Sequence, residues 1–416
     1  MKQYNTYKPS GIEWLGDIPE HWEVKRVKDF GEYQSGYFID ANEFDNDNDY
    51  PVFGGNGLRG YACKFNHNGE YILIGRQGAL CGNVNFASGK FWATEHAVVV
   101  YSKKGIHKRW YAYLLEIMNL NQYAISAAQP GLSVEKIRRL MLPYISFTEQ
   151  TAIANYLDTK TAAIDRKIEL LTTKANKYKA LRRSLINETV CRGLNPNAPL
   201  KDSDIEWIGK IPEHWEVKRV KDNLDLLTGN SISDKTDFED SNNSIPYVAT
   251  KDIEINSCNI DYENGIYIPR KELKKFKTIN PNSILLCIEG GSAGKKIAFN
   301  TRRICFVNKL CSFSSKGNAV DIKYNFYQMQ SAPWLFQFNQ VMNGLIGGVS
   351  VSLLKTFRLI TPPKNEQVEI ANYLNEKTTQ IDTILTNISE QITKFTQLRK
   401  TLINDVVTGK IKVTEE

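Results

Sequence analysis

The chain has 416 residues, with 42% hydrophobic and 24% charged side chains and a formal net charge of +7. This length predicts two or more domains, and the composition is that of a soluble globular protein. No apolar run approaches the ~18 residues of a membrane-spanning helix, and the N-terminus lacks the apolar stretch of a secretory signal. We therefore expect a cytoplasmic protein whose moderate basic charge permits an anionic partner without proving one.

The seven cysteines form no CxxC pair. An odd number without paired spacing argues against a disulfide framework and against a zinc ribbon. We expect buried free thiols and no metal site.

A short segment occurs twice, as IEWLGDIPEHWEVKRVKD at Ile12–Asp29 and as IEWIGKIPEHWEVKRVKD at Ile205–Asp222, with 16 of 18 positions identical. If the two halves recognise two different nucleic-acid sequences, residues that are identical in both halves cannot distinguish between them. We therefore expect this motif to anchor each domain. His21 and His214 lack a second ligand at a metal spacing, which favours a structural role for both.

A second repeat follows, in which GLSVEKIRRLMLPYISFTEQTAIANYLDTKTAAID from Gly131 matches GVSVSLLKTFRLITPPKNEQVEIANYLNEKTTQID from Gly348. The offset is 193 residues for the first repeat and 217 for the second, so the second middle is 24 residues longer. Weaker likeness between the segments from Tyr71 and Ser283 indicates a strand, a Gly-rich loop and a strand in each middle. One duplicated fold with two divergent middles is therefore predicted.

After Glu149 and Glu366 the apolar residues fall into heptads, with flanking positions such as Leu181 widening the stripe while Lys160 and Lys174 face away. Such sustained heptads predict a long helix that packs against another long helix. A single amphipathic helix on a globular core is the alternative. If the halves are related by an approximate two-fold axis, the helices run antiparallel. The heptad positions are Leu157, Ile164, Leu171, Tyr178, Leu185, Leu374, Ile381, Ile388, Phe395 and Leu402.

The motifs GIEWLGDIPEHWE and DIEWIGKIPEHWE, with EQTAIANYLDTKTAAID…LRRSLINETV and its copy EQVEIANYLNEKTTQID…LRKTLINDVV, resemble the specificity subunit of type I restriction-modification enzymes. The resemblance covers nearly the whole chain. It implies that each variable domain reads one half of a split, asymmetric site in double-stranded DNA. It also implies that the helices act as a spacer and dock two methyltransferase subunits, which restriction subunits then join. S-adenosylmethionine, ATP and Mg²⁺ would be used by those partners, so we expect no cofactor in this chain.

Together these patterns predict an α+β fold with an internal pseudo-two-fold repeat. Two similar mixed α/β target-recognition domains are joined by two long antiparallel helices in a coiled coil. We expect the first recognition domain at 1–148, the first helical spacer at 149–193, the second recognition domain at 194–365 and the second spacer at 366–416.

Catalytic motifs are incomplete. The segment EGGSAGKK at Glu289–Lys296 lacks the Gly and the Ser or Thr of a phosphate loop. The segment TPPK at Thr361–Lys364 lacks the flanking residues with which an adenine methyltransferase holds a flipped base. A non-catalytic binding subunit is therefore predicted.

DNA affinity should come from Lys and Arg on phosphates, and specificity from side chains at base edges. We select basic and amide residues beside the Gly-rich loops, although a solvated surface charge is the alternative for any single one. In the first domain the candidates are Asn56, Arg59, Lys64, Arg76 and Gln77. In the second they are Lys251, Arg270, Lys274, Lys275, Lys277, Ser292, Lys295, Lys296, Asn308 and Lys309.

Two other functions stay open. A coiled-coil adaptor that binds only proteins would show no salt-dependent affinity for duplex DNA. A fusion of methyltransferase and specificity subunit would turn over methyl donor without partners.

Overall fold

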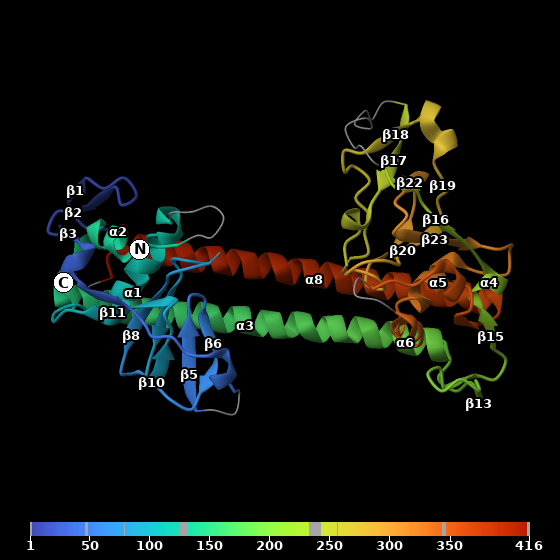
Figure 1. Ribbon diagram of the computed structural model, residues 1–416, viewed down its shortest axis with the longest axis horizontal. Coiled ribbons are helices and arrows are strands. Elements are labelled where there is room, and N and C mark those ends of the chain that lie inside the picture. Colours follow the sequence, from blue (N-terminus) through green and yellow to red (C-terminus); the bar gives the residue numbers. More distant parts are fainter. Residues whose placement is uncertain are drawn as a thin grey trace. The chain divides into compact units, whose positions relative to one another are not determined.

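The computed structural model describes residues 2–45, 49–78, 80–124, 131–232, 243–255, 257–342 and 347–413. The chain divides into two compact units. Unit 1 comprises Met1–Thr172 and Glu390–Glu416, and unit 2 comprises Thr173–Ser389. Two long helices, α3 (Phe147–Arg192) and α8 (Lys364–Val407), contribute to both (Figure 1).

Unit 1 contains two four-stranded sheets and two strand pairs. The first sheet has the order β4 (Gly31–Ser35), β11 (Ala97–Ser102), β8 (Tyr71–Gly75), β9 (Val84–Ala87). The second has the order β6 (Gly57–Ala62), β5 (Tyr50–Gly54), β10 (Lys90–Ala93), β7 (His67–Asn68). The pairs are β1 (Tyr7–Pro9) with β2 (Asp17–Pro19), and β3 (Glu23–Arg26) with β12 (Met141–Tyr144). The short helices are η1 (Val27–Asp29), η2 (Ala41–Glu43), α1 (Lys108–Ile117), η3 (Leu120–Tyr123) and α2 (Val134–Arg139).

Unit 2 repeats this topology strand for strand. Its first sheet is β16 (Leu224–Thr228), β23 (Leu310–Ser315), β20 (Ser283–Cys287), β21 (Ile297–Asn300). Its second sheet is β18 (Tyr267–Pro269), β17 (Ser244–Val248), β22 (Ile304–Phe306), β19 (Thr278–Ile279). The pairs are β13 (Leu200–Asp202) with β14 (Lys210–Pro212), and β15 (Glu216–Arg219) with β24 (Arg358–Thr361). The short helices are α4 (Val220–Asn223), η5 (Thr250–Asp252), η6 (Arg270–Lys275), α5 (Ile322–Gln328), α6 (Ala332–Val341) and α7 (Val351–Leu354).

The matching strand orders confirm that one fold has been duplicated, including the divergent middles. The two copies differ at the hairpin on the edge of the second sheet. β5 and β6 are joined by a tight turn, whereas a much longer segment joins β17 to β18.

The strands β8 and β20 explain why both middles carry a continuous apolar run. In β8, Ile72 and Ile74 face the core under the helices, while Leu73 faces the second sheet. In β20, Ile284 and Leu285 divide between two cores in the same way. Because successive side chains of a strand point to opposite faces, a strand covered on both faces is apolar throughout.

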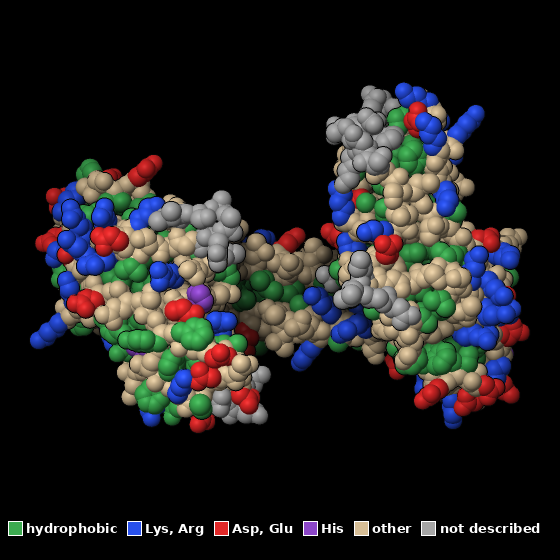
Figure 2. Space-filling view, viewed as in Figure 1, with side chains coloured by type: hydrophobic (Ala, Val, Ile, Leu, Met, Phe, Trp, Pro, Cys, Tyr) green, Lys and Arg blue, Asp and Glu red, His purple; other side chains and the backbone are tan. Residues whose placement is uncertain are grey.

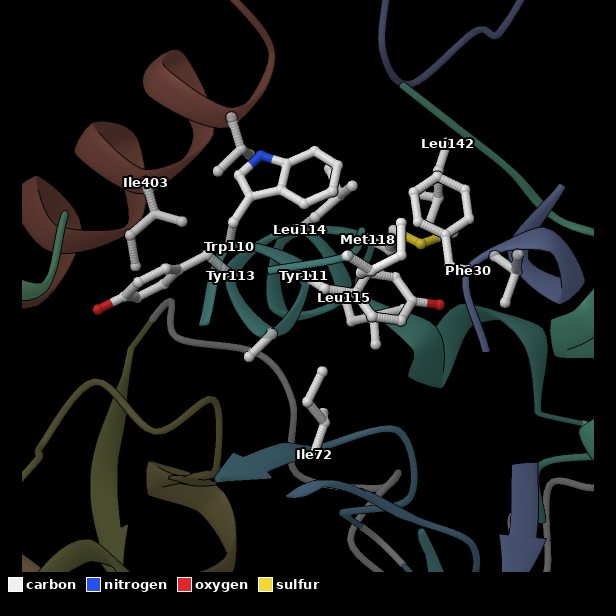
Figure 3. Close-up of a cluster of buried hydrophobic side chains, with 14 of the residues drawn as sticks. Phe30, Ile72, Trp110, Tyr111, Tyr113, Leu114, Leu115, Met118, Leu142 and Ile403 are labelled. Atoms are coloured by element: carbon white, nitrogen blue, oxygen red, sulfur yellow. The ribbon is translucent and has the colours of Figure 1, made fainter. Parts of the chain in front are cut away.

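The core of unit 1 lies between the first sheet, α1 and the long helices (Figure 3). Trp110 and Leu114 of α1 are fully buried, with Phe30 on one side. Ile403 reaches this core from α8, although it lies far along the chain (Figure 3). The C-terminal helix is therefore an integral part of the first domain's core.

The two long helices run antiparallel in each unit, as predicted. In unit 1, Arg399 of α8 pairs with Asp165 of α3, and Leu402 shares a core with Leu157. In unit 2, Arg182 of α3 pairs with Asp382 of α8. The ten predicted heptad residues all lie on these helices and are buried or half-buried.

One flanking position was assigned to the wrong face. Leu181 does not widen the apolar stripe, because its side chain is 52% exposed. Seven-residue spacing places it in the column of Lys160, Lys167 and Lys174, which are all exposed. The half-buried residue beside it is Arg182.

All seven cysteines are free thiols, as predicted. Five are buried, Cys258 is half-buried, and Cys63 is exposed, so burial was wrongly predicted for Cys63. In the parts of the chain that the structure describes, no helix combines the length and apolar character needed to cross a bilayer. Those same parts contain no cluster of His, Cys, Asp and Glu suited to a metal ion.

Candidate nucleic-acid interface

In unit 1, the four loops that follow β4, β5, β8 and β10 meet at the carboxyl ends of these strands. β4 and β8 both pair antiparallel with β11 and so run in the same direction, and β10 runs parallel to β5. The Arg76 amide donates to the carbonyl of His96 at 2.8 Å, and the Arg76 guanidinium donates to Ser35 Oγ at 3.0 Å. Asn83 donates to Asn56 Oδ1 at 3.3 Å. We call this meeting of loops the strand-end surface of unit 1, with Ser35, Asn56, Arg76, Gln77, Asn83 and His96 on it.

Close contact between two of these loops requires glycine. A Cβ added to Gly75, at the end of β8, would lie only 2.0 Å from the carbonyl oxygen of Gly55. Any larger residue would push the loops apart. The Gly-rich character of this middle therefore brings Asn56 next to the loop that carries Arg76 and Gln77.

The structure brings three of the five predicted unit 1 residues together, namely Asn56, Arg76 and Gln77, and all three are exposed. Arg59 lies on β6, with its guanidinium 5.5 Å from the ring centroid of Phe44. Lys64 pairs with Glu43, and its hydrogen bond holds the pKa of that carboxyl below the usual value. Because a carboxylate already accompanies its charge, Lys64 is the least available of the five for a phosphate.

The same strand ends meet in unit 2, where six candidates follow β17, β20 and β22. Lys251 and Lys296 line one groove of about 420 Å³, and Lys296 Nζ donates to the carbonyl of Thr250 at 2.7 Å. Asn308 accepts from Ser231 Oγ at 2.9 Å, and the carbonyl of Lys309 accepts from the Ile288 amide at 2.9 Å. The strand-end surface of unit 2 carries Lys251, Ser292, Lys295, Lys296, Asn308 and Lys309.

The remaining unit 2 candidates belong to a separate stretch around η6. Arg270, Lys274 and Lys275 lie on this helix and are exposed, and Lys275 pairs with Glu272 at 2.7 Å. Lys277 follows η6, and its amide donates to Asn230 Oδ1 at 2.8 Å. Lys277 therefore lies beside the loop after β16, whereas the other three extend along the second sheet.

Sequence reasoning missed the loops after β4 and β16. Tyr37 is 63% exposed and Phe38 is 72% exposed in unit 1, while Asn230 and Ser231 stand at the equivalent place in unit 2. None of these four residues carries a positive charge, so a pattern of basic residues does not reveal them. The position of each pair could have indicated the loops, because each pair follows a strand end at the same distance from the duplicated motif. Figure 2 shows Lys and Arg on both units with Asp and Glu among them.

The duplicated motif anchors each domain to the beginning of a long helix. Trp22 Nε1 donates to Glu149 Oε1 at 3.2 Å, and His21 Nε2 lies 3.2 Å from the other carboxylate oxygen. In unit 2 the indole of Trp215 donates to Glu366 at 2.9 Å, and a histidine again lies on the other oxygen, at 2.6 Å. These contacts agree with the predicted mechanical role of the motif and with a structural role for both histidines.

Comparison with known proteins gives one consistent family. A family model described as a type I restriction modification DNA specificity domain matches residues 19–177 and 212–394. The EcoprrI specificity subunit of Escherichia coli is 45% identical over 161 residues, which are 38% of this chain and 40% of that protein. The match to a putative specificity subunit of Haemophilus influenzae spans 30% of that protein, at 30% identity.

Two further comparisons span nearly the whole chain. The MjaVIII specificity subunit of Methanocaldococcus jannaschii is 23% identical over 429 residues, covering 95% of this chain and 94% of that protein. A chain from a structure on complex assembly and conformational transition of the type I restriction-modification system has a TM-score of 0.64 at 12% identity. That match covers 95% of this chain and 99% of the other, so the two share a fold.

Proposed function

Because this chain belongs to the family of type I restriction-modification DNA specificity domains, we propose that it selects the DNA site for such a complex. Each unit reads one half of a bipartite, asymmetric double-stranded site through its strand-end surface. The relatives are named specificity subunits, and the chain is the non-catalytic member of its complex. The complex as a whole is an adenine-specific DNA methyltransferase and ATP-dependent endonuclease.

The contrast between identical anchors and different strand ends carries this proposal. The Trp and His of the anchor are the same in both units, whereas the residues at equivalent strand ends differ. Arg76 and Ile288 occupy equivalent positions, because the carbonyl of each accepts the amide that follows Gly131 or Gly348. His96 and Lys309 are equivalent as well, since their carbonyls accept the amides of those two residues. Equal backbone frames with different side chains around the strand ends suit the reading of two different half-sites.

The helical parts of the chain serve assembly. The spacers span residues 149–193 and 366–416, and the recognition domains span residues 1–148 and 194–365. The spacers dock two methyltransferase subunits, and restriction subunits join them in the cytoplasm. Methyl donor, ATP and Mg²⁺ act in those partners. Leu181 of α3 and Leu398 of α8, which are 52% and 50% exposed, each mark a helix face that is available for such docking.

A domain exchange tests this function. Residues 30–145 are replaced by the equivalent segment of another specificity subunit, and the hybrid is expressed with its partner subunits. Single-molecule methylation mapping should show one half of the site changed and the other half retained. The matched exchange of the second middle should change only the other half. Unchanged methylation at both halves would refute the proposal.

A further inference from the structure

A tyrosine completes the anchor in unit 1. The Tyr4 hydroxyl donates to Glu149 Oε1 at 2.5 Å. Its ring centroid lies 5.6 Å from that of His21 and 5.9 Å from that of Trp22. Lys412 lies 6.0 Å from the same ring. The carboxylate is thereby enclosed, and the side chain of Glu149 is only 8% exposed.

The equivalent place in unit 2 is open. A pocket of about 330 Å³ lies beside Glu366, whose side chain is 36% exposed. The position that matches Tyr4 by the offset of the first repeat is Asn197, which is exposed. Residues that line the pocket include Arg192, Leu194, Ala198, Pro212, His214 and Glu366.

Chain connectivity explains the difference. In unit 1 the two ends of the chain overlap, and the Lys412 amide donates to the carbonyl of Lys2 at 2.9 Å. This overlap supplies enough residues to bury Tyr4 together with Ile411 against the core. In unit 2 one continuous link, residues 193–199, runs from the end of α3 to β13. The link is too short to fill the space that the overlapping ends fill in unit 1.

We propose that the pocket beside Glu366 receives a tyrosine side chain from a protein partner, presented by an extended segment like Lys2–Asn5. The phenol hydroxyl donates to the Glu366 carboxylate, as Tyr4 donates to Glu149. Glu366 already accepts from Trp215 and contacts His214, but an ionised carboxylate has about four acceptor positions and so accommodates a third donor. Leu194 and Ala198 provide apolar contact for the ring. This site goes beyond the proposed DNA selection and does not depend on it.

Binding of a short peptide to the full chain tests the site directly. The probe is the acetylated and amidated tetrapeptide Lys-Gln-Tyr-Asn, which has the sequence of Lys2–Asn5. The indole N–H signal of Trp215, assigned with Trp215→Phe, should shift saturably at millimolar peptide. The signal of Trp22 should stay in place, because Tyr4 occupies its site. A peptide with Phe in place of Tyr should bind roughly tenfold more weakly, because it lacks the hydrogen bond to the carboxylate.

Three variants separate this site from unspecific binding. Ala198→Trp fills the pocket and should abolish the shift of Trp215. Tyr4→Ala opens the unit 1 site, so the Trp22 signal should then respond as well. Glu366→Gln should remove the preference for Tyr over Phe, which keeps the test decisive if Ala198→Trp fails to fold. An unmoved Trp215 signal, or equal affinity for the two peptides, would overturn the proposal. Neither readout involves DNA, so the two proposals fail independently.

Discussion

Equivalent arginines on the two long helices make charged contacts that differ in one partner. Substituting each arginine should therefore destabilise the two units by different amounts. In unit 1, Arg399 donates to Glu116 at 2.5 Å and contacts Asp165 at 3.1 Å. In unit 2, the equivalent Arg182 contacts Asp382 at 3.1 Å and donates to the neutral amide of Gln330 at 3.3 Å. Burial alone would lower the pKa of Arg399, but Glu116 and Asp165 outweigh burial and raise it.

Arg399→Met keeps most of the apolar stem and removes the charge. It leaves two carboxylates without their shared partner, whereas Arg182→Met leaves one carboxylate and one amide. A hydrogen bond to a charged group contributes about 1.5–3 kcal/mol when buried. The Arg399 side chain is 25% exposed, so we discount each contact for solvent screening. We expect a loss of about 2–3 kcal/mol for Arg399→Met and about 1–2 kcal/mol for Arg182→Met.

Hydrogen exchange measures this for each unit separately, which matters because unfolding of two units need not be two-state. The free energy of opening is taken from amides of α1 for unit 1 and of α5 for unit 2. Adding Asp165→Asn to Arg399→Met should restore part of the loss, because it removes one unpaired carboxylate. A loss for Arg182→Met that equals or exceeds the loss for Arg399→Met would refute the reasoning, as would a double variant without any recovery.

Further predictions concern the strand-end surface of unit 1, the thiols and the duplication. Arg76→Ala should reduce the difference in binding free energy between the correct and an altered half-site by about 1–3 kcal/mol in a DNA-binding assay. Lys104→Ala, which removes the same charge after β11, should leave that difference unchanged. Burial raises the pKa of Cys191 to about 11, whereas Cys63 is exposed. Iodoacetamide at pH 8 should therefore label Cys63 before Cys191, as measured by peptide mapping. Labelling of Cys191 first would contradict this prediction. The folded state keeps the Cys191 proton to a higher pH than the unfolded chain does. The contribution of this thiol to the free energy of unfolding is therefore present below about pH 9 and is lost as the pH rises towards 11. A fragment ending at Gly193 should form a homodimer that specifies a palindromic split site, and a folded monomer in sedimentation would show that the helix pairing is wrong.

The sequence predicted the helices and the duplication because both depend on periodicity. The heptads from Leu157 and Leu374 mark helices that begin at Phe147 and Lys364, close to the expected starts at 149 and 366. The first ends at Arg192, beside the expected boundary at 193, whereas the second ends at Val407, before the expected boundary at 416. The strands at Tyr71 and Ser283 were also predictable, since each is an apolar run before a Gly-rich loop.

The grouping of candidate site residues was not predictable in the same way. The strand order in the sheets is not the order along the chain, so the sequence does not show that Asn56 lies beside the loop of Arg76. Nor does it show that Lys64 pairs with Glu43, because that contact depends on how η2 folds back on the second sheet. Pairing of this kind decides which cations remain available for a phosphate.

The long segment between β17 and β18 leads into the edge strand of its sheet, and this position bears on how such a protein can change. The entropic cost of closing a flexible connection rises by only about 0.6 kcal/mol for each doubling of its length. Added residues at a rim also leave the interior strand ladders intact, because β18 has a single neighbour. Evolution can therefore lengthen the exposed part of this outer hairpin, around Ile255, and with it the reach of the domain, at little thermodynamic cost to the fold, provided that Ile253 stays in its core cluster.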